Sequence, residues 1–313
     1  MFRKLFLWGS RSDWLRKQVS RSRLGRRAVR RFMPGESLHD ALVAIDGFRA
    51  SGIGTVLTNL GENVTELGQA NEVVRHYQHV LGEVAAAGPD TEVSIKLTHL
   101  GLDLDGEKAF ENLATLARSA RGHGNYVWVD MEATAYTDVT LDLVRRARAE
   151  HDNVGVCLQA YLYRTDADLS ALLPTGCGIR LVKGAYDEPA DLAWPKKRDV
   201  DESFLRLSKR LLAEAPARGN RVAIATHDER LIERVCEAAG AIGASREAFE
   251  FQLLYGIRPD LQKRLAADGY RVRTLISYGE EWFAWYMRRL AERPANVFFV
   301  VRALVRASPR TAI

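Results

Sequence analysis

The chain has 313 residues and a mass of 35.1 kDa; 47% of the residues are hydrophobic and 27% are charged. This composition is typical of a globular chain with apolar material for a large core, and it excludes collagen, disorder and a disulfide scaffold. The longest uncharged apolar runs fall far short of the roughly 18 residues that a membrane span requires. The three cysteines are widely separated and form no CxxC pair, which argues against a zinc site and favours a reducing compartment. They are Cys157, Cys177 and Cys236.

Positive charge is concentrated at the N-terminus. Residues 1–34 carry eleven Lys and Arg and one Asp, whereas the net charge of the whole chain is only +5. Such a segment could dock on anionic lipid or nucleic acid, or it could be a solvated helix that caps the core. Apolar side chains among the charges, such as Phe6 and Trp8, favour a membrane surface. We therefore expect residues 1–50 to form a basic helical arm packed on the rest of the chain.

From residue 51 onward, short β-branched apolar runs alternate with longer segments of helical period. Eight runs are predicted as strands, beginning at Ile53, Glu92, Tyr126, Val154, Gly178, Arg221, Phe249 and Arg271. Helices are predicted at 64–87, 107–121, 139–150, 166–173, 202–215, 229–239 and 280–293, and 166–173 has the weakest pattern. This alternation predicts an α/β fold, a parallel (β/α)8 TIM-like barrel over residues 51–295, followed by a C-terminal helix or tail at 296–313. An open doubly wound sheet is the alternative, but no GxGxxG follows the first strand.

Polar side chains interrupt the predicted strands. Strands of a parallel barrel are buried on both faces, so a charged side chain there needs a partner or a ligand. An internal ion pair explains any single case, but the set as a whole lies toward the carboxyl ends of strands, where barrel enzymes carry their active sites. The set comprises Lys96, Asp130, Gln159, Arg180, Lys183, His227, Glu250 and Gln252.

The last predicted helix adds Arg288, Arg289 and Glu292, with Trp285 one turn before the arginines. With these included, cations outnumber anions by two at the predicted mouth, which indicates an anionic ligand. A phosphate at Lys183 and the following backbone amides, or a carboxylate held by an arginine, would fit this charge.

Two other function classes remain open from the residues alone. A barrel lyase could form a Schiff base at Lys96 or Lys183. A non-enzymatic scaffold could bind membrane or nucleic acid through the basic arm. No metal site is expected, because His227 and Asp228 have no second histidine at ligand spacing. The other histidines are interpreted as surface residues: His76, His79, His99, His123 and His151.

Seven strings in the chain resemble the bacterial proline dehydrogenases, both the monofunctional enzymes and the catalytic domain of the bifunctional ones. They are SIKLTHLG, VDMEA, QAYLYRT, RLVKGAY, ATHDERLI, FEFQLLYG and YMRRLAERPAN, in the order of the family, between about Gly52 and Arg302. The resemblance implies a distorted barrel with extra N-terminal helices and substrate-binding arginines on the last helix. It implies noncovalent FAD, oxidation of L-proline to Δ1-pyrroline-5-carboxylate by hydride transfer to flavin N5, and electron transfer to a membrane quinone. It also implies the first step of proline degradation to glutamate, a cytoplasmic location with peripheral contact at the inner face of the membrane, and no nucleic-acid partner.

The resemblance also implies roles for individual residues. The substrate would contact Lys96, Arg288, Arg289, Tyr278, Leu254 and Trp285, the first three through the proline carboxylate. The catalytic residues would be Arg180 beside N5, Asp130 and Lys96. The gate would be Glu62 paired with Arg288. The cofactor would contact Met131, Gln159, Arg180, Val182, Lys183, Gly184, Ala185, Tyr186, Thr226, His227, Gln252 and Glu292.

Two positions depart from the family pattern. Trp285 stands where several relatives have a tyrosine, and this puts in doubt the size of the pocket and its tolerance of hydroxylated proline. Asp187 stands where the bifunctional relatives have a tryptophan, which suggests a different hold on the adenine end of FAD.

Overall fold

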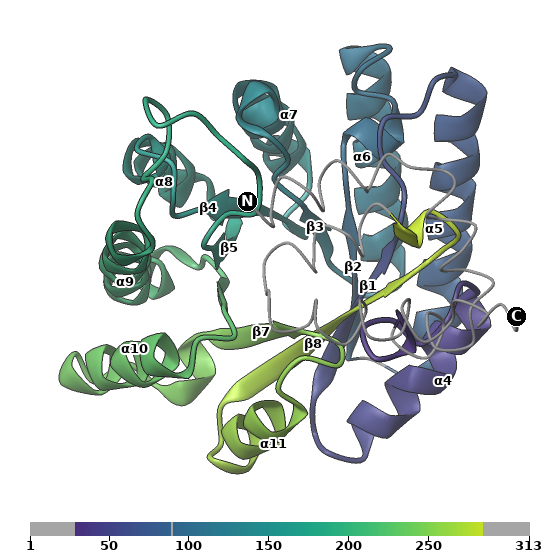
Figure 1. The fold of residues 1–313 in the computed structure, drawn as a ribbon. Coiled ribbons are helices and arrows are strands. Elements are labelled where there is room, and N and C mark those ends of the chain that lie inside the picture. Colours follow the sequence, from purple (N-terminus) through teal and green to yellow (C-terminus); the bar gives the residue numbers. More distant parts are fainter. Residues whose placement is uncertain (1–28, 89, 284–313) are drawn as a thin grey trace, which may run out of the picture.

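Eight parallel strands close into a barrel in chain order, so that β8 pairs with β1 (Figure 1). The structure is a computed structural model that describes residues 29–88 and 90–283. The strands are β1 (Gly54–Asn59), β2 (Thr91–Ile95), β3 (Val127–Val129), β4 (Val154–Gln159), β5 (Gly178–Val182), β6 (Val222–Ala225), β7 (Glu250–Leu254) and β8 (Arg271–Tyr278). The predicted α/β barrel and its eight strands are therefore confirmed.

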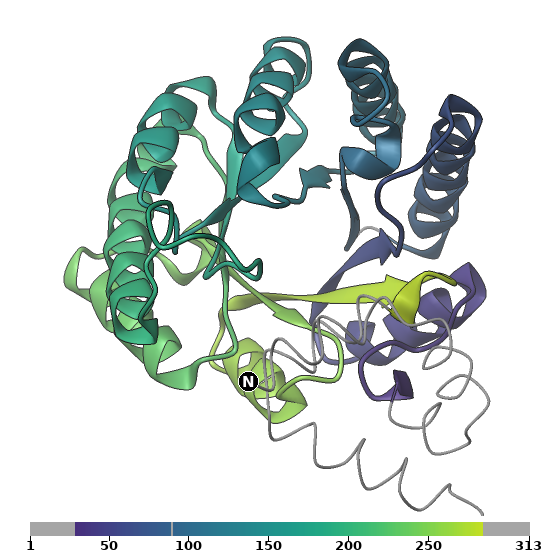
Figure 2. The same ribbon diagram turned by 45° about the horizontal axis from the view of Figure 1, so that its top comes forward.

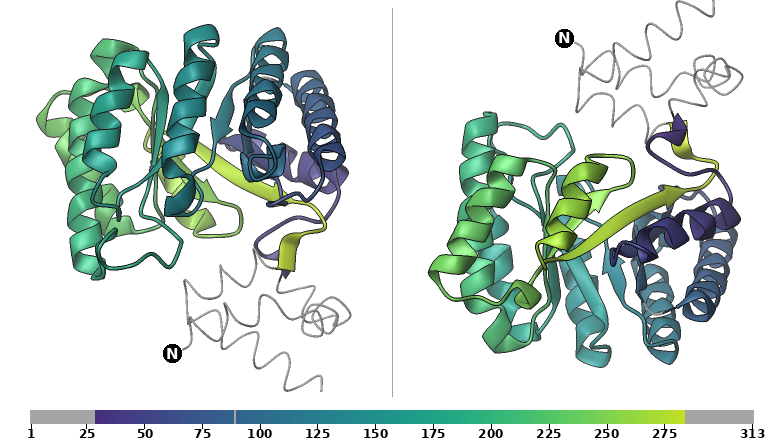
Figure 3. Two further views of the ribbon diagram at one scale, coloured as in Figure 1. Left: turned by 90° about the horizontal axis from the view of Figure 1, so that it is seen from above. Right: turned by 90° about the horizontal axis from the view of Figure 1, so that it is seen from below.

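Helices surround the strands on the outside of the barrel (Figures 1 and 3). They are α4 (Leu38–Arg49), α5 (Leu67–Ala87), α6 (Gly106–Gly122), α7 (Thr137–Glu150), α8 (Thr165–Leu172), α9 (Lys197–Glu214), α10 (Glu229–Ala241) and α11 (Pro259–Ala267). Helix α8, which had the weakest sequence pattern, forms because Leu169 and Leu172 are buried and Arg164 pairs with Asp168 at 2.9 Å. None of the helices within the described ranges is both long and apolar enough to cross a bilayer.

Helix α4 occupies the outside of the barrel beside β8 and β1 (Figure 2). Ser37 caps its N-terminus: Ser37 Oγ accepts a hydrogen bond from the Asp40 backbone at 3.1 Å, while the Asp40 carboxylate accepts from the Ser37 backbone at 3.2 Å. This reciprocal cap satisfies two of the backbone N–H groups left unpaired at a helix start. Ala41 and Ile45 then enter the main core. The last part of the predicted arm thus packs on the barrel, while residues 1–28 lie outside the described residues.

Side chains along each strand alternate between the inside and the outside of the barrel. Outward residues such as Leu57, Val93 and Phe251 pack with the helices in the main core. A smaller cluster has inward residues, comprising Val56, Tyr126, Trp128 and Ala223, with Leu275 packed against it. Charged and polar side chains lie on both sides of this inner cluster, toward the two ends of the barrel.

An ion cluster fills the amino-terminal end of the barrel. Arg221 Nη1 donates to Glu92 Oε1 at 2.8 Å, and Arg273 Nε donates to Glu250 Oε2 at 3.1 Å. Arg273 also pairs with Asp90 at 2.8 Å. Burial alone would raise the pKa of Glu250, but the charges of Arg273 and Arg221 outweigh it and hold that pKa below its usual value.

Glu250 was expected near the mouth of the barrel, and that prediction is wrong. Glu250 is the first residue of β7, so its carboxylate lies at the amino end of the barrel, where Arg221 and Arg273 pair with it. A parallel strand carries its first residue to the end opposite the active-site face.

Candidate functional site

Four predicted polar residues gather toward the carboxyl ends of neighbouring strands. Lys96 and Asp130 directly follow β2 and β3, Gln159 ends β4, and Arg180 lies at the centre of β5. Trp128 and Val129 pair in register with Ser94 and Ile95, so the residues that follow them, Asp130 and Lys96, lie on adjacent strand ends. The barrel therefore brings these residues to one face, as the positions in the sequence predicted.

Arg180 is held by a compact hydrogen-bonded group. Its Nη1 donates to Asp130 Oδ1 at 2.9 Å and to Ser94 Oγ at 2.9 Å. Ser94 Oγ in turn donates to Asp130 Oδ1 at 2.8 Å. The side chain of Arg180 is only 3% exposed, so its charge depends on these partners for compensation.

Two donor atoms of Arg180 are left over. The Nε and Nη2 atoms are buried, and neither has a hydrogen-bond partner among the described residues. Buried guanidinium donors are rarely left unpaired because desolvation without a hydrogen bond costs about 1–3 kcal/mol per group. These donors indicate a ligand with acceptor atoms next to Arg180.

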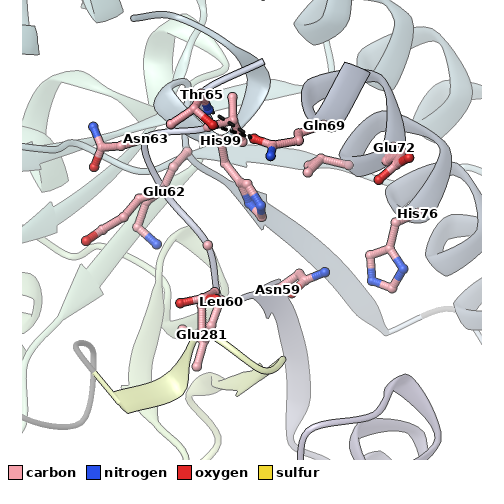
Figure 4. Close-up of a pocket in the computed structure, with 14 residues that line it drawn as sticks. Asn59, Leu60, Glu62, Asn63, Thr65, Gln69, Glu72, His76, His99 and Glu281 are labelled. Atoms are coloured by element: carbon pink, nitrogen blue, oxygen red, sulfur yellow. Dashed lines mark hydrogen bonds between the residues drawn. The ribbon is translucent and has the colours of Figure 1, made fainter. Parts of the chain in front are cut away.

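A hollow of about 550 Å³ opens beside the carboxyl ends of β1 and β2 (Figure 4). Lys96 lines it from the end of β2, and Glu62 lines it from the loop that follows β1. Glu281, just after β8, lines the same hollow. The predicted carboxylate-binding lysine and the predicted gate residue thus share one cavity.

Two histidines also line this hollow, His76 from α5 and His99 from the 3-10 turn Thr98–Leu100 (Figure 4). His99 is 9% exposed, and burial lowers the pKa of its imidazole to about 4. Burial also lowers the pKa of His76, which is half-buried. The prediction that the histidines are surface residues is wrong for His99 and for His151, which is 8% exposed. The His99 ring lies directly against Gly61 in the loop after β1.

Tyr278 lies at the end of β8 and is fully buried. Its hydroxyl lies 2.8 Å from His76 Nε2, and it belongs to the same outward-facing core as Ile276. Its ring therefore faces α5 rather than the barrel interior, and it supports the wall of the hollow through His76.

Lys183, just after β5, sits between two carboxylates. Its Nζ donates to Asp201 Oδ1 at 2.6 Å and to Asp228 Oδ2 at 3.0 Å, and Lys197 donates to the same two aspartates. Burial favours the neutral form of Asp228, but the hydrogen bonds and charges of Lys183 and Lys197 hold its pKa below the usual value. Lys183 is thus fixed between α9 and α10 at the mouth of the barrel.

Gly184 follows Lys183 with a φ of +117°, a conformation that residues with a side chain rarely adopt. A Cβ at this position would collide with the ring of Tyr161. The loop after β5 therefore requires glycine here, and its backbone turns close to the end of β4.

The loop after β3 is fixed by a buried carboxylate. Glu132 accepts hydrogen bonds from the Thr98 backbone at 3.2 Å and from Thr98 Oγ1 at 2.7 Å. Gln159 Nε2 donates to the Glu132 carbonyl at 2.8 Å. Burial raises the pKa of Glu132, although the Thr98 hydrogen bonds oppose the shift. Sequence reasoning missed Glu132 and Ser94; a charge two residues beyond Asp130 and a hydroxyl two residues before Lys96 were the available signals.

The other predicted cofactor residues lie at the same face. Within β7, Gln252 donates to Glu250 Oε1 at 2.6 Å, and its own Oε1 is buried without a hydrogen-bond partner in the described parts of the chain. The remaining cofactor residues lie at strand ends or in the loops after β3, β5 and β6: Met131, Val182, Ala185, Tyr186, Thr226 and His227. Leu254, which was predicted to contact the substrate, ends β7. The predicted residues Trp285, Arg288, Arg289 and Glu292 lie outside the described residues.

Comparisons with known proteins give the same family over most of the chain. The family model for proline dehydrogenase matches residues 41–302. A protein from Deinococcus radiodurans named proline dehydrogenase is 40% identical over 297 residues, which cover 93% of this chain and 94% of that one. Proline dehydrogenase 1 of Bacillus subtilis subsp. natto is 37% identical over 308 residues, covering 98% of this chain and all of the relative.

A solved structure shares the fold. Proline utilization A from Bdellovibrio bacteriovorus, inactivated by N-propargylglycine, aligns with a TM-score of 0.79 and 25% identity. The alignment covers 86% of this chain and 33% of that chain, so this chain corresponds to about a third of the larger protein.

Proposed function

This chain belongs to the proline dehydrogenase family, and from that premise we propose that it oxidises L-proline to Δ1-pyrroline-5-carboxylate with FAD, and that a membrane quinone then takes the electrons. Loss of a hydride from carbon and a proton from nitrogen yields the imine product. Such a reaction requires the protein to orient the substrate, set the electrostatics and exclude water.

The observation that carries the proposal is the pair of buried, unpaired donors on Arg180. The edge of a flavin ring offers several acceptor atoms and one N–H donor. Arg180 Nε and Nη2 match the acceptors, and the unpaired Gln252 Oε1 matches the donor. The residues present therefore fit the group chemically, and FAD, when bound, supplies the acceptor for the hydride.

We assign the hold on FAD to three parts of the mouth. Arg180, Gln159, Gln252 and Met131 would contact the ring. The rest of the cofactor would contact Val182 at the end of β5 and the loops after β5 and β6, through Lys183, Gly184, Ala185, Tyr186, Thr226 and His227. Glu292 would complete the set.

The hollow beside β1 and β2 is the proposed substrate site. Lys96 supplies a cation for the proline carboxylate, and Arg288 and Arg289 would supply two more. Leu254, Trp285 and Tyr278 would shape the pocket, the last through its hydrogen bond to His76. Glu62 would close over the bound substrate by pairing with Arg288.

Among the described residues, Arg180 would orient the flavin ring and place a positive charge beside it. Asp130 and Ser94 hold the Arg180 side chain in position. A guanidinium beside the ring favours a reduced flavin that carries negative charge. The amine of bound proline must be neutral before hydride leaves, so we expect kcat/KM to rise with pH.

Lys183 does not support the alternative function as a Schiff-base lyase, because an ammonium that donates to Asp201 and Asp228 is not available as a nucleophile.

We propose that the basic segment 1–34 provides peripheral contact with the inner face of the membrane, where the quinone lies.

Anaerobic addition of L-proline to the purified protein tests the proposed function. We expect the flavin absorbance at about 450 nm to bleach with L-proline, whereas D-proline serves as the stereochemical control. A colourless protein, or a yellow protein that saturating L-proline leaves oxidised, would contradict the proposal.

A further inference from the structure

The indole ring of Trp128 lies inside the barrel, against the guanidinium of Arg180. Trp128 lies at the centre of β3, and its side chain is fully buried inside the barrel. The Arg180 Cζ lies 4.7 Å from the centre of the indole ring, and the Arg221 Cζ lies 5.4 Å from it. Arg180 pairs in register with Ala223, two residues beyond Arg221, so Arg180 meets the indole nearer the mouth and Arg221 nearer the amino end.

Two glycines make room for the inner aromatic rings, Gly155 for Trp128 and Gly178 chiefly for Tyr126. A Cβ at Gly155 on β4 would lie 2.7 Å from Trp128 Cζ3. A Cβ at Gly178 on β5 would lie 3.3 Å from Trp128 Cη2 and would also collide with the Tyr126 hydroxyl. Glycine weakens a strand, so its presence at both positions ties the local sequence of β4 and β5 to the placement of Trp128 and its neighbour Tyr126.

The indole of Trp128 is hydrogen-bonded to the ion cluster at the amino end of the barrel. Trp128 Nε1 donates to Glu92 Oε2 at 2.7 Å. Glu92 Oε1 in turn accepts from Arg221 Nη1 at 2.8 Å and pairs with Arg273 at 3.3 Å. The ion cluster at the amino end therefore fixes the ring that Arg180 rests on.

The contacts to Asp130 and Ser94 do not fix Arg180 alone. Both hydrogen bonds use the single atom Nη1, about which the guanidinium plane could still turn. A flat aromatic face under Cζ removes that freedom and attracts the cation. The remaining donors, Nε and Nη2, are thereby kept in one orientation.

We propose that Trp128 is a positioning residue for Arg180, and that the stack of Glu92, Trp128 and Arg180 sets the electrostatics of the flavin site. The inference rests on the proposed function, because it assumes that Arg180 faces the flavin. It assigns the ion cluster at the opposite end of the barrel an indirect role in the chemistry at the mouth.

The first test compares Trp128→Leu and Trp128→Phe with the wild-type holoenzyme. We expect Trp128→Leu to lower the flavin midpoint potential and to raise the FAD dissociation constant about fivefold to thirtyfold. Trp128→Phe keeps an aromatic face and should restore most of both properties. The matched control is Trp194→Phe, a change at an exposed tryptophan, which should leave both unchanged.

A second measurement keeps the test decisive if Trp128→Leu does not fold. Fluorinated tryptophan, incorporated throughout the chain, weakens the attraction of the ring face for a cation with little change of shape. The potential should fall on fluorination in the wild-type protein and should not respond in the Trp128→Phe background. Equal responses in both backgrounds, or a folded Trp128→Leu variant with wild-type potential and FAD affinity, would overturn the inference.

The two proposals fail in different ways. A wild-type protein without flavin, or one that L-proline does not reduce, removes the proposed function and this inference with it. A wild-type protein that L-proline bleaches, combined with unchanged Trp128 variants, removes only the role of Trp128.

Discussion

Asp130 and Arg180 form an ion pair of 2.9 Å that joins the end of β3 to the centre of β5. Ser94 on β2 bonds to both members, so three neighbouring strands meet at one charged group. Arg180 is almost fully buried and Asp130 is 23% exposed, so the ion pair lies where the interior of the barrel meets its mouth. This arrangement gives each partner a distinct, measurable role.

Asp130→Asn removes the countercharge of Arg180 while keeping the shape of the side chain. We expect the free energy of unfolding to fall by about 2 kcal/mol, because a buried cation loses its partner, and kcat/KM for proline to fall about 10- to 100-fold as Arg180 shifts. Urea unfolding and steady-state kinetics measure the two effects. The control is Asp152→Asn, in an exposed pair with Arg121, which should change stability by less than about 0.5 kcal/mol. Equal effects of the two substitutions would contradict the assignment.

Arg180→Met and Arg180→Lys separate charge from hydrogen bonding. Methionine removes both the charge and the free donors, so we expect the FAD dissociation constant to rise about 30- to 150-fold and the flavin potential to fall. Lysine keeps the charge without the planar fork, so it should preserve much of the potential and little of the affinity. FAD titration and a redox titration measure the two properties. A wild-type potential in Arg180→Met would rule out the role of this guanidinium at the flavin.

The barrel and much of its mouth were predictable from the sequence because the signals are local. Short β-branched apolar runs mark the strands, and a charge near the end of a buried strand marks the mouth, as with Lys96 and Asp130. Glu250 was misplaced although the predicted strand begins at Phe249, one residue before it. Its position at the start of the strand already indicated the amino end of the barrel, but the residue was grouped with the mouth because of its charge.

Contacts across the barrel could not be predicted. Trp128 was not assigned a role, although the alternating aromatics at 126 and 128 and the glycines at 155 and 178 were all visible. Whether these glycines face the aromatic rings depends on the register of β3, β4 and β5, which the local sequence of each strand does not specify. For the same reason His76 and His99 were taken for surface residues. The sequence shows which segment carries each histidine, but not what packs against its ring. His76 packs against Tyr278 of β8, and His99 packs against Gly61.

Lys96→Met tests the substrate site in the hollow. Loss of one charge-assisted contact to a carboxylate should raise the KM for proline about 10- to 100-fold, with little change in FAD content. The matched control is Lys108→Met, which removes a partly exposed lysine that pairs with Glu111 outside the hollow, and it should leave KM unchanged. Steady-state kinetics with proline, together with the ratio of flavin to protein, measure the effect. Loss of FAD at an unchanged KM would place Lys96 on the cofactor instead.

His99 should make the stability of the protein depend on pH between about 4 and 6.5. Its pKa is about 4 in the folded chain and 6.5 when unperturbed, so the unfolded chain binds more protons within this range. Stability is therefore fully present above pH 6.5 and falls as the pH drops toward 4, by up to about 3 kcal/mol. Part of the slope should remain without His99, because burial also lowers the pKa of His76 and of His151.

His99→Gln removes this titration from the wall of the hollow. Urea unfolding at a series of pH values should give a shallower loss of stability below pH 6.5 than in the wild-type protein, whatever the absolute stability at neutral pH. His123→Gln, at the exposed end of α6, should keep the wild-type slope. If His99→Gln and His123→Gln show the same slope, His99 is protonated as readily in the folded chain as in the unfolded one, and its burial has no electrostatic consequence.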